Sequence, residues 1–234
     1  MISVRDDFDE RVTEIENYFR FVQNLVEERF EILPNTARGG IALTLNEEDL
    51  LIKTLKANCF LLLYNLVEAT TKNAIQAIFD EFKSRGITYD QCTQEVRRIA
   101  IKNLKREKLG IDQIYPRLTI VAQHIMTEPF DKDALLAGNV DALALKSLAK
   151  EYGFSEPTQR CDKFKDVREN RNYLAHGNKT FKEIGRDYTI QDLEVITNQI
   201  KVFLSAFVDS VDDYLINQHY LLTYSATNTP TAVT

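Results

Sequence analysis

The chain has 234 residues, 44% of them hydrophobic, so it can bury the core of one large domain and is not disordered throughout. Its net charge of −6 argues against a protein that coats nucleic acid, although one local basic site could still act on RNA. No run of about 18 apolar residues is free of charges, and the start, MISVRDDFDE, is unlike a signal peptide. We therefore expect a cytoplasmic protein with no membrane partner.

The first predicted helix is FDERVTEIENYFRFVQNLVEERFEIL. Its apolar residues recur at spacings of three and four, which places them on one side of a helix. This stripe consists of Val12, Ile15, Phe19, Val22 and Val26. The segment LPNTARGG then ends the helix, because proline and glycine interrupt helical structure.

The second predicted helix begins near Asn46 and continues to about Ser84, just before Gly86. Asn46 and Asp49 resemble a capping pair at its start. The centre of the helix, CFLLLYNLV, is apolar on every side except at Asn65. A helix of this kind is expected to be buried all round, in a bundle or at an oligomer interface.

Two polar residues of this helix, Asn65 and Glu68, would then need partners, because an unpaired buried polar group costs several kcal/mol. Glu68 has two interpretations. It is either a structural acid, paired with a base or facing solvent, or a group that tunes Arg171 or His176.

Residues 87–157 are less regular, and we interpret them as a helical insertion between two pairs of core helices. They contain the basic helix DQCTQEVRRIAIKNLKREK, the short segment IDQIYPRLTIVAQHIM and the helix of GNVDALALKSLAKEYGF, which Asn139 caps and Gly153 ends. The basic helix is either a solvated face or a docking surface for RNA or an acidic partner. Its candidate RNA-binding residues are Arg97, Arg98, Lys102 and Lys105.

The third core helix is predicted over residues 160–176, with Gly177 as its end. After the connector GNKTFKEIGRDY, Thr189 and Asp192 form a predicted capping box for the last helix, which reaches about Tyr220. The architecture is therefore an all-α bundle of four long helices with additional short ones. We expect one domain over residues 1–222 and a disordered tail over 223–234.

Arg171 is the unusual residue of the third helix, because it falls on the apolar stripe between Val167 and Leu174. Arginine is almost never fully buried without a partner. Two explanations are open. Arg171 pairs with an internal acid such as Glu68, or the stripe faces a cleft or dimer seam in which the guanidinium could hold a phosphate.

Asn172 and His176 are four residues apart and share one side of the helix, whereas Arg171 and His176 diverge by roughly 140°. Gly177 ends the helix, so His176 at a frayed terminus could reach the Arg171 side. Two copies meeting across a symmetric seam would also join these groups. The spacing alone is a weak pattern, because a histidine at a helix C-terminus often interacts only with the helix dipole.

Other groups give little sign of chemistry. The three cysteines are far apart and form no C-x-x-C, so neither a zinc ribbon nor a disulfide framework is predicted, and no metal or other cofactor is expected. His124 and His219 are interpreted as structural or surface residues. Tyr173 is predicted to be exposed, where it could stack on a base, although a packing role is the alternative.

The segment VRENRNYLAHGNKTF, followed by a long terminal helix, resembles the HEPN superfamily, whose signature is an arginine, a polar residue, about three further residues and a histidine. Arg171, Asn172 and His176 match it directly. The segments NCFLLLYNLVEATTKNAI and LAGNVDALALKSLAKEYGF resemble the MAE-type branch of that superfamily, and the resemblance extends over residues 8–220.

This resemblance implies a metal-independent endoribonuclease with a composite site at a homodimer seam. It implies that His176 is the general acid and base of a 2′-hydroxyl attack, that Arg171 neutralises phosphoryl charge, and that Asn172 orients the phosphate or the histidine. The protein would be the toxin of a toxin–antitoxin or defence system, with a cognate antitoxin or regulatory protein. The alternative is a non-catalytic HEPN module that binds nucleotides or protein.

Overall fold

The computed structural model describes residues 4–27, 43–106 (side chains to residue 103) and 140–222, and these residues are mostly helical. The elements are α1 (Val4–Val26), α2 (Leu45–Ser84), a 3-10 turn η2 (Tyr89–Gln91), α3 (Gln94–Arg106), α6 (Ala142–Tyr152), α7 (Phe164–Ala175), α8 (Phe181–Asp187) and α9 (Ile190–Ile216). Within these ranges the only β-type pairing is an isolated bridge between Cys92 and Leu221. The predicted all-α class is confirmed.

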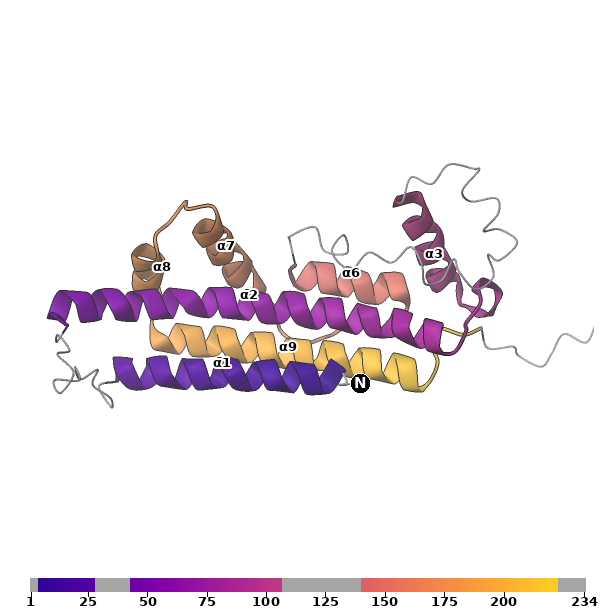
Figure 1. Ribbon diagram of the computed structural model, residues 1–234, viewed down its shortest axis with the longest axis horizontal. Coiled ribbons are helices and arrows are strands. Elements are labelled where there is room, and N and C mark those ends of the chain that lie inside the picture. Colours follow the sequence, from indigo (N-terminus) through magenta and orange to yellow (C-terminus); the bar gives the residue numbers. More distant parts are fainter. Residues whose placement is uncertain (1–3, 28–42, 107–139, 223–234) are drawn as a thin grey trace, which may run out of the picture.

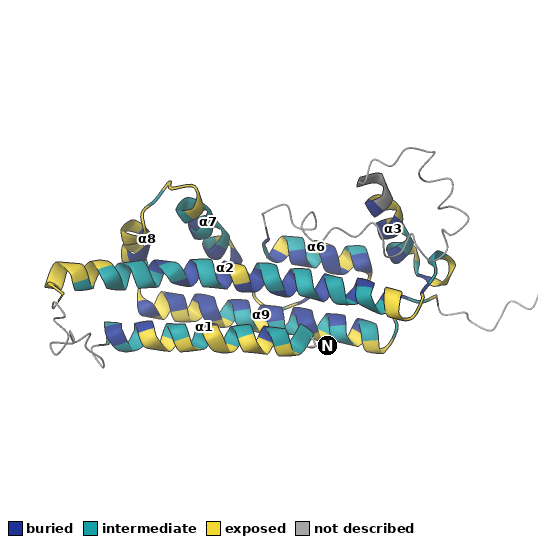
Figure 2. Ribbon diagram, in the orientation of Figure 1, coloured by how far each residue is buried: buried dark blue, intermediate teal, exposed yellow. Residues whose placement is uncertain are grey.

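Three long helices form the body of the molecule, with α1 running opposite to α2 and α9 (Figure 1). α7 and α8 lie on one side of α2 near its start, α6 lies further along, and α3 lies at the opposite end (Figure 1). The buried faces follow the lines along which the long helices meet (Figure 2). Two of the largest fully buried side chains, Phe60 of α2 and Phe207 of α9, are part of this core.

The first helix packs through the predicted stripe. Ile15 and Val22 are buried, and the other members of the stripe are half-buried against the core. Polar contacts at the start and in the middle of α1 hold it on α9: Arg5 contacts Ser205 and Asp209, and Lys201 contacts Glu16. The predicted stripe is therefore the interface between α1 and the rest of the bundle.

The start of α2 differs from the prediction. Its cap is Thr44, whose hydroxyl accepts from the backbone N–H of Glu47, while the Glu47 carboxylate accepts from the backbone N–H of Thr44. Asn46 is already inside the helix, and Asp49 forms an ion pair with Lys53 one turn later instead of capping. The end of the helix at Ser84 agrees with the prediction.

α2 is the central helix and contacts α1, α7, α8 and α9. By length and composition it could also cross a membrane, but a core helix packed against several other helices has the same composition. Within this one chain the centre is not buried on every side: Leu61 is half-buried and Asn65 is exposed, and both line a groove beside Arg171. The other predicted alternative, burial at an oligomer interface, stays a prediction.

α6 packs against α3 and contributes buried residues such as Leu145 to the core. Its N-cap is Asp141, whose carboxylate accepts from the Ala144 N–H, so the predicted cap at Asn139 is wrong, and Asn139 itself lies outside the described residues. Asp141 also forms an ion pair with Arg168 of α7. Gly153 ends the helix at φ 85°, the left-handed conformation that glycine favours, as predicted.

The region predicted as the third core helix and a connector contains two short helices. α7 begins at Phe164 instead of residue 160, so it is shorter than the other three core helices, and α8 occupies most of the segment read as a connector. α8 lies directly against α2: a Cβ added at Gly185 would lie 1.9 Å from the backbone oxygen of Lys53. Glycine is therefore required for this close helix contact.

The last helix begins with the predicted capping box of Thr189 and Asp192. It ends at Ile216, earlier than the predicted Tyr220, which is buried in the turn that follows. The backbone oxygen of Tyr220 accepts from the Thr93 N–H, which fastens this turn to the start of α3. The predicted tail, 223–234, and the segment IDQIYPRLTIVAQHIM with His124 lie outside the described residues.

Candidate functional site

The C-terminus of α7 is closed by a complete set of backbone hydrogen bonds. Gly177 adopts φ 69°, and its N–H donates to the Leu174 oxygen, while the Asn178 N–H donates to the Tyr173 oxygen. This is the Schellman arrangement, in which a left-handed glycine satisfies the last carbonyls of a helix. Gly177 is thus the predicted end signal, but the expectation of a frayed terminus is wrong.

Arg171 lies half-buried between α7 and α2. Its guanidinium carbon is 4.4 Å from the centroid of the Tyr64 ring, and its Nη1 donates to the Asn172 side-chain oxygen at 3.1 Å. None of the carboxylates in the described chain forms an ion pair with it. The predicted pairing with Glu68 is wrong, because Glu68 lies one turn from Lys72 on the same helix and pairs with that ammonium at 2.8 Å.

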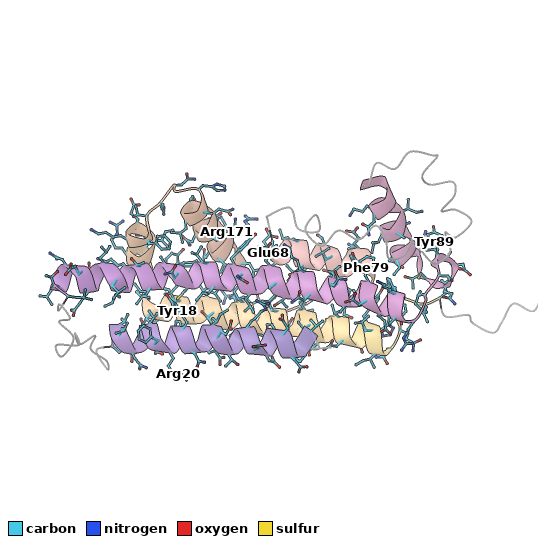
Figure 3. The ribbon with its side chains drawn as sticks, in the orientation of Figure 1. Tyr18, Arg20, Glu68, Phe79, Tyr89 and Arg171 are labelled. Carbon is cyan, nitrogen blue, oxygen red and sulfur yellow. The ribbon has the colours of Figure 1, made fainter. Side chains whose placement is uncertain are left out.

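Arg171 lines a groove of about 390 Å³ whose other residues come from one side of α2. These residues are Leu61, Tyr64, Asn65, Glu68, Ala69 and Lys72. Figure 3 shows Arg171 and Glu68 on the same side of α2. The groove lies along one side of the apolar centre of α2. Asn65 is exposed there and not buried, whereas Glu68 is half-buried and paired with Lys72, which agrees with the interpretation of a structural acid paired with a base.

His176 is exposed and is the C-cap residue of α7, with its backbone N–H donating to the Asn172 oxygen. Within the described residues no hydrogen bond or ion pair joins its imidazole to Arg171. The closed helix end holds the His176 backbone in the helical register, in which the two residues diverge by roughly 140°. Arg171 and Asn172 are in contact, and the structure does not bring His176 to them within one chain.

Tyr173 is half-buried against the core and not exposed as predicted, and the Lys179 ammonium lies 5.1 Å from its ring centroid. The helix wheel failed at this position because it treats α7 alone. The loop that returns to α8 places Lys179 over the ring, and a hydrogen bond from the Asn178 N–H to the Tyr173 oxygen fixes that loop. Stacking of Tyr173 on a base stays a prediction.

Asn170 is a positioning residue that the sequence analysis missed. It is only 5% exposed, and its amide donates to the Asp166 backbone oxygen and to the Tyr188 hydroxyl, both at 2.8 Å. The Tyr188 ring packs edge-on against Phe60 at 4.7 Å, and burial raises the pKa of its hydroxyl. Asn170 therefore fastens α7 to the core. Its position three residues after Val167, on the apolar stripe, was the available signal.

The basic helix lies at the far end of the molecule from Arg171, beside Tyr89 (Figure 3). Arg97 donates to the backbone oxygens of Tyr89 and Asp90, and Lys102 forms an ion pair with Glu151 of α6. Arg98 is exposed, and the side chain of Lys105 lies outside the described residues. The structure does not bring these cations to the groove, and their contact with RNA stays a prediction.

The remaining polar groups have structural surroundings. Burial raises the pKa of the Cys59 thiol to about 12 and that of the Cys92 thiol to about 11, so both stay protonated at neutral pH. His219 is exposed, with its Nε2 3.4 Å from the Asp213 carboxylate. In the described part of the chain, no three histidine, cysteine, aspartate or glutamate residues are grouped so that they could hold a metal ion.

The fold and the groove define an all-α domain in which an arginine and an asparagine meet on one helix that ends at a histidine. The model of the MAE-type HEPN family matches residues 3–220, nearly the whole chain. The chain therefore belongs to the MAE-type HEPN family, and the resemblance noted from its motifs is confirmed. Comparison with curated proteins and with solved structures gives no match.

Proposed function

We propose that the protein is a metal-independent RNA endonuclease that cleaves by attack of a 2′-hydroxyl on the adjacent phosphate. The observation that carries this proposal is Arg171. Its guanidinium is held at the mouth of a groove by an aromatic ring and an amide, with no carboxylate from the described chain to neutralise it. A guanidinium held in this way keeps its charge and its N–H donors for a phosphate.

In the proposed reaction, His176 removes the proton from the ribose 2′-hydroxyl as that oxygen attacks phosphorus. The bond from phosphorus to the 5′-oxygen breaks, and an imidazolium returns a proton to the leaving oxygen. Arg171 stabilises the charge that develops on the phosphoryl oxygens, and Asn172 orients Arg171 through their hydrogen bond. The products are a 2′,3′-cyclic phosphate and a free 5′-hydroxyl.

A homodimer is part of this proposal. Backbone hydrogen bonds at the end of α7 hold His176 in the helical register, in which its side chain and Arg171 of the same chain diverge by roughly 140°. A second copy that places its α7 against the first would join an Arg171 from one chain to a His176 from the other. The apolar centre of α2, which is half-buried at Leu61 and Leu62, is the surface for this contact.

We further propose a cytoplasmic toxin of a toxin–antitoxin or defence system, held inactive by a cognate antitoxin or regulatory protein. An uncontrolled ribonuclease would damage the RNA of its own cell, which is the reason to expect such a partner. Residues 1–222 would act as one domain, with 87–157 as its insertion and 223–234 as a disordered tail.

The test is cleavage of a mixed RNA by the purified protein in EDTA, with analysis of the product ends. We expect cleavage with 2′,3′-cyclic phosphate ends, and at least about 100-fold slower cleavage by His176→Ala, the size of a lost general acid and base. His219→Ala, which changes an exposed histidine far from the groove, is the matched control and should cleave normally. Equal cleavage by wild type and His176→Ala would contradict the catalytic assignment.

A second candidate function is a non-catalytic module that binds nucleotides or protein. The open groove favours it, because its volume and its mixture of apolar and polar residues are those of a small-ligand site. The cleavage assay, together with a measurement of RNA binding, separates the ribonuclease from the module. RNA binding without cleavage, unchanged by His176→Ala, would favour the module.

A further inference from the structure

Tyr64 of α2 lies directly beneath Arg171. Its side chain is 3% exposed, so the ring is part of the core, while one face carries the guanidinium at 4.4 Å. The Tyr64 hydroxyl is 3.5 Å from the backbone nitrogen of Val140, at the entry to α6. The ring is therefore held by the core on one side and covered by an arginine on the other.

The Tyr64 ring differs from a carboxylate, which is the usual partner of a half-buried arginine. A carboxylate would occupy the N–H groups of the guanidinium and cancel its charge. A ring attracts the cation through its face, at distances below about 6 Å, and leaves the N–H groups at the edge unoccupied. Together, the Tyr64 face and the Asn172 oxygen hold the Arg171 guanidinium beside the groove.

We propose that Tyr64 is a positioning residue for Arg171: its ring face holds the guanidinium at the groove, so that its N–H groups are presented to the phosphate of the RNA. This inference rests on the proposed ribonuclease function. Tyr64 itself does not touch the reacting atoms. Its ring face, and not its hydroxyl, is the part that acts, since the hydroxyl is turned toward Val140.

Three variants separate positioning from simple packing. Tyr64→Leu removes the ring and is expected to lower kcat/KM by between about 3-fold and 30-fold, the range of a cation–π contact converted to a rate. Tyr64→Phe keeps the ring face and should restore kcat/KM to within about twofold of wild type. Phe79→Leu is the matched control, because Phe79 is a buried ring of the same helix that packs on Phe82 and Tyr152.

Figure 3 shows that Phe79 lies well along α2 from Arg171. A loss of kcat/KM in Phe79→Leu equal to that in Tyr64→Leu, at matched thermal stability, would overturn the inference. So would an equal loss in Tyr64→Phe and Tyr64→Leu, because the hydroxyl would then be the group that matters.

A double-mutant cycle tests whether Tyr64 acts through Arg171. The readout is the Kd for an RNA oligonucleotide with 2′-O-methyl riboses, which lack the attacking hydroxyl. Tyr64→Leu should raise this Kd by more than about threefold in the wild-type chain, but by less than about twofold in an Arg171→Ala chain. If Tyr64→Leu raised the Kd by the same factor in the wild-type chain and in the Arg171→Ala chain, the inference would be overturned.

The contact between the Tyr64 ring and Arg171 can also be tested without RNA. This test still applies if the protein proves not to be a ribonuclease. The ring current of Tyr64 should move the Arg171 Nε–H proton resonance upfield, and Tyr64→Leu should return it to the position of an exposed arginine. An Arg171 resonance that is the same in wild type and Tyr64→Leu would overturn the proposed contact.

Discussion

The two ends of the molecule both carry arginines on short helices, yet the arginines have different surroundings. At the α3 end, Arg97 donates to two backbone oxygens and covers the Tyr89 ring at 5.5 Å. At the α7 end, Arg171 covers the Tyr64 ring at 4.4 Å and donates only to a neighbouring amide among the described residues. Arg97 joins η2 to α3, whereas among the described residues Arg171 contacts the Tyr64 ring and the Asn172 side-chain oxygen.

The difference shows that the number of basic residues on a helix does not tell how many of them the chain itself already engages. α3 has the greater density of basic residues, and yet the chain itself uses Arg97 and Lys102 for internal contacts. α7 has fewer basic residues and places one of them at a groove. A guanidinium is available for an anion when its neighbours hold it without neutralising it.

The largest expected effect on stability concerns the attachment of the α7 end. Gly185→Ala would place a methyl group 1.9 Å from the Lys53 backbone oxygen, so α8 must move off α2. We expect a loss of about 3 kcal/mol in the free energy of unfolding, measured by urea denaturation. Because α8 follows α7 directly, RNA cleavage should fall as well.

Gly86→Ala is the control for Gly185→Ala. An added Cβ at Gly86 meets nothing within 4 Å, although φ of 61° makes the backbone conformation unfavourable for alanine. We expect a loss of only about 1 kcal/mol there, with cleavage unchanged. Equal losses in the two variants would mean that α8 does not lie against α2 as described.

Asn170→Ala should have the next largest effect. It removes both hydrogen bonds of the amide and leaves the Tyr188 hydroxyl without that partner, for an expected loss of about 2 kcal/mol. Tyr188→Phe in the same chain should recover part of the loss, because the stranded hydroxyl is then absent. If the double variant is no more stable than Asn170→Ala, the bond between these side chains contributes nothing.

A smaller effect concerns pH. Hydrogen bonds from the Thr189 side chain and backbone lower the pKa of Asp192, and the Thr88 hydroxyl does the same for Asp90 at the α3 end. The folded pKa lies below the unfolded one, near 4, so this stabilisation is present above that value and is lost as pH falls through the folded pKa. Asp192→Asn should therefore flatten the fall in Tm between about pH 5 and pH 3. An unchanged slope would contradict this role.

The smallest effect is expected at the α3 end. Lys102→Ala breaks the ion pair with Glu151, in which the Lys102 side chain is half exposed. Exposed pairs of this kind contribute less than about 1 kcal/mol, so we expect a change below about 0.5 kcal/mol and unaltered RNA cleavage. A clear loss of cleavage would show that α3 contacts RNA after all.

Much of the fold could be predicted because its signals are local. The stripe of α1, the capping box at Thr189 and the glycine ends at Gly153 and Gly177 depend only on neighbours in sequence. The caps at Thr44 and Asp141 were missed because Asn46 and Asn139 offered similar chemistry close by, and only the backbone conformation decides between them. α8 was missed because its segment follows Gly177 and contains Gly185, and a short stretch with two glycines resembles a loop.

The site was predicted in part. The sequence marked Arg171 as misplaced on an apolar stripe, and this was correct. The sequence could not identify the partner of Arg171. Tyr64 is distant from Arg171 along the chain, and its position in an apolar segment predicts only a core residue of α2. Glu68 was the natural choice on charge, but Lys72 was closer along the helix. The contact between α2 and α7 is tertiary, and helical periodicity alone does not determine it.

The most direct test compares one arginine from each end in the same assay. Initial rates of RNA cleavage in EDTA are measured for Arg171→Ala and for Arg98→Ala, which removes an exposed cation of α3. We expect Arg171→Ala to be slower than wild type by at least about 100-fold, the size of a lost electrostatic contact to the transition state, and Arg98→Ala to cleave at the wild-type rate. Equal rates in the two variants would contradict the assignment of Arg171 to the site.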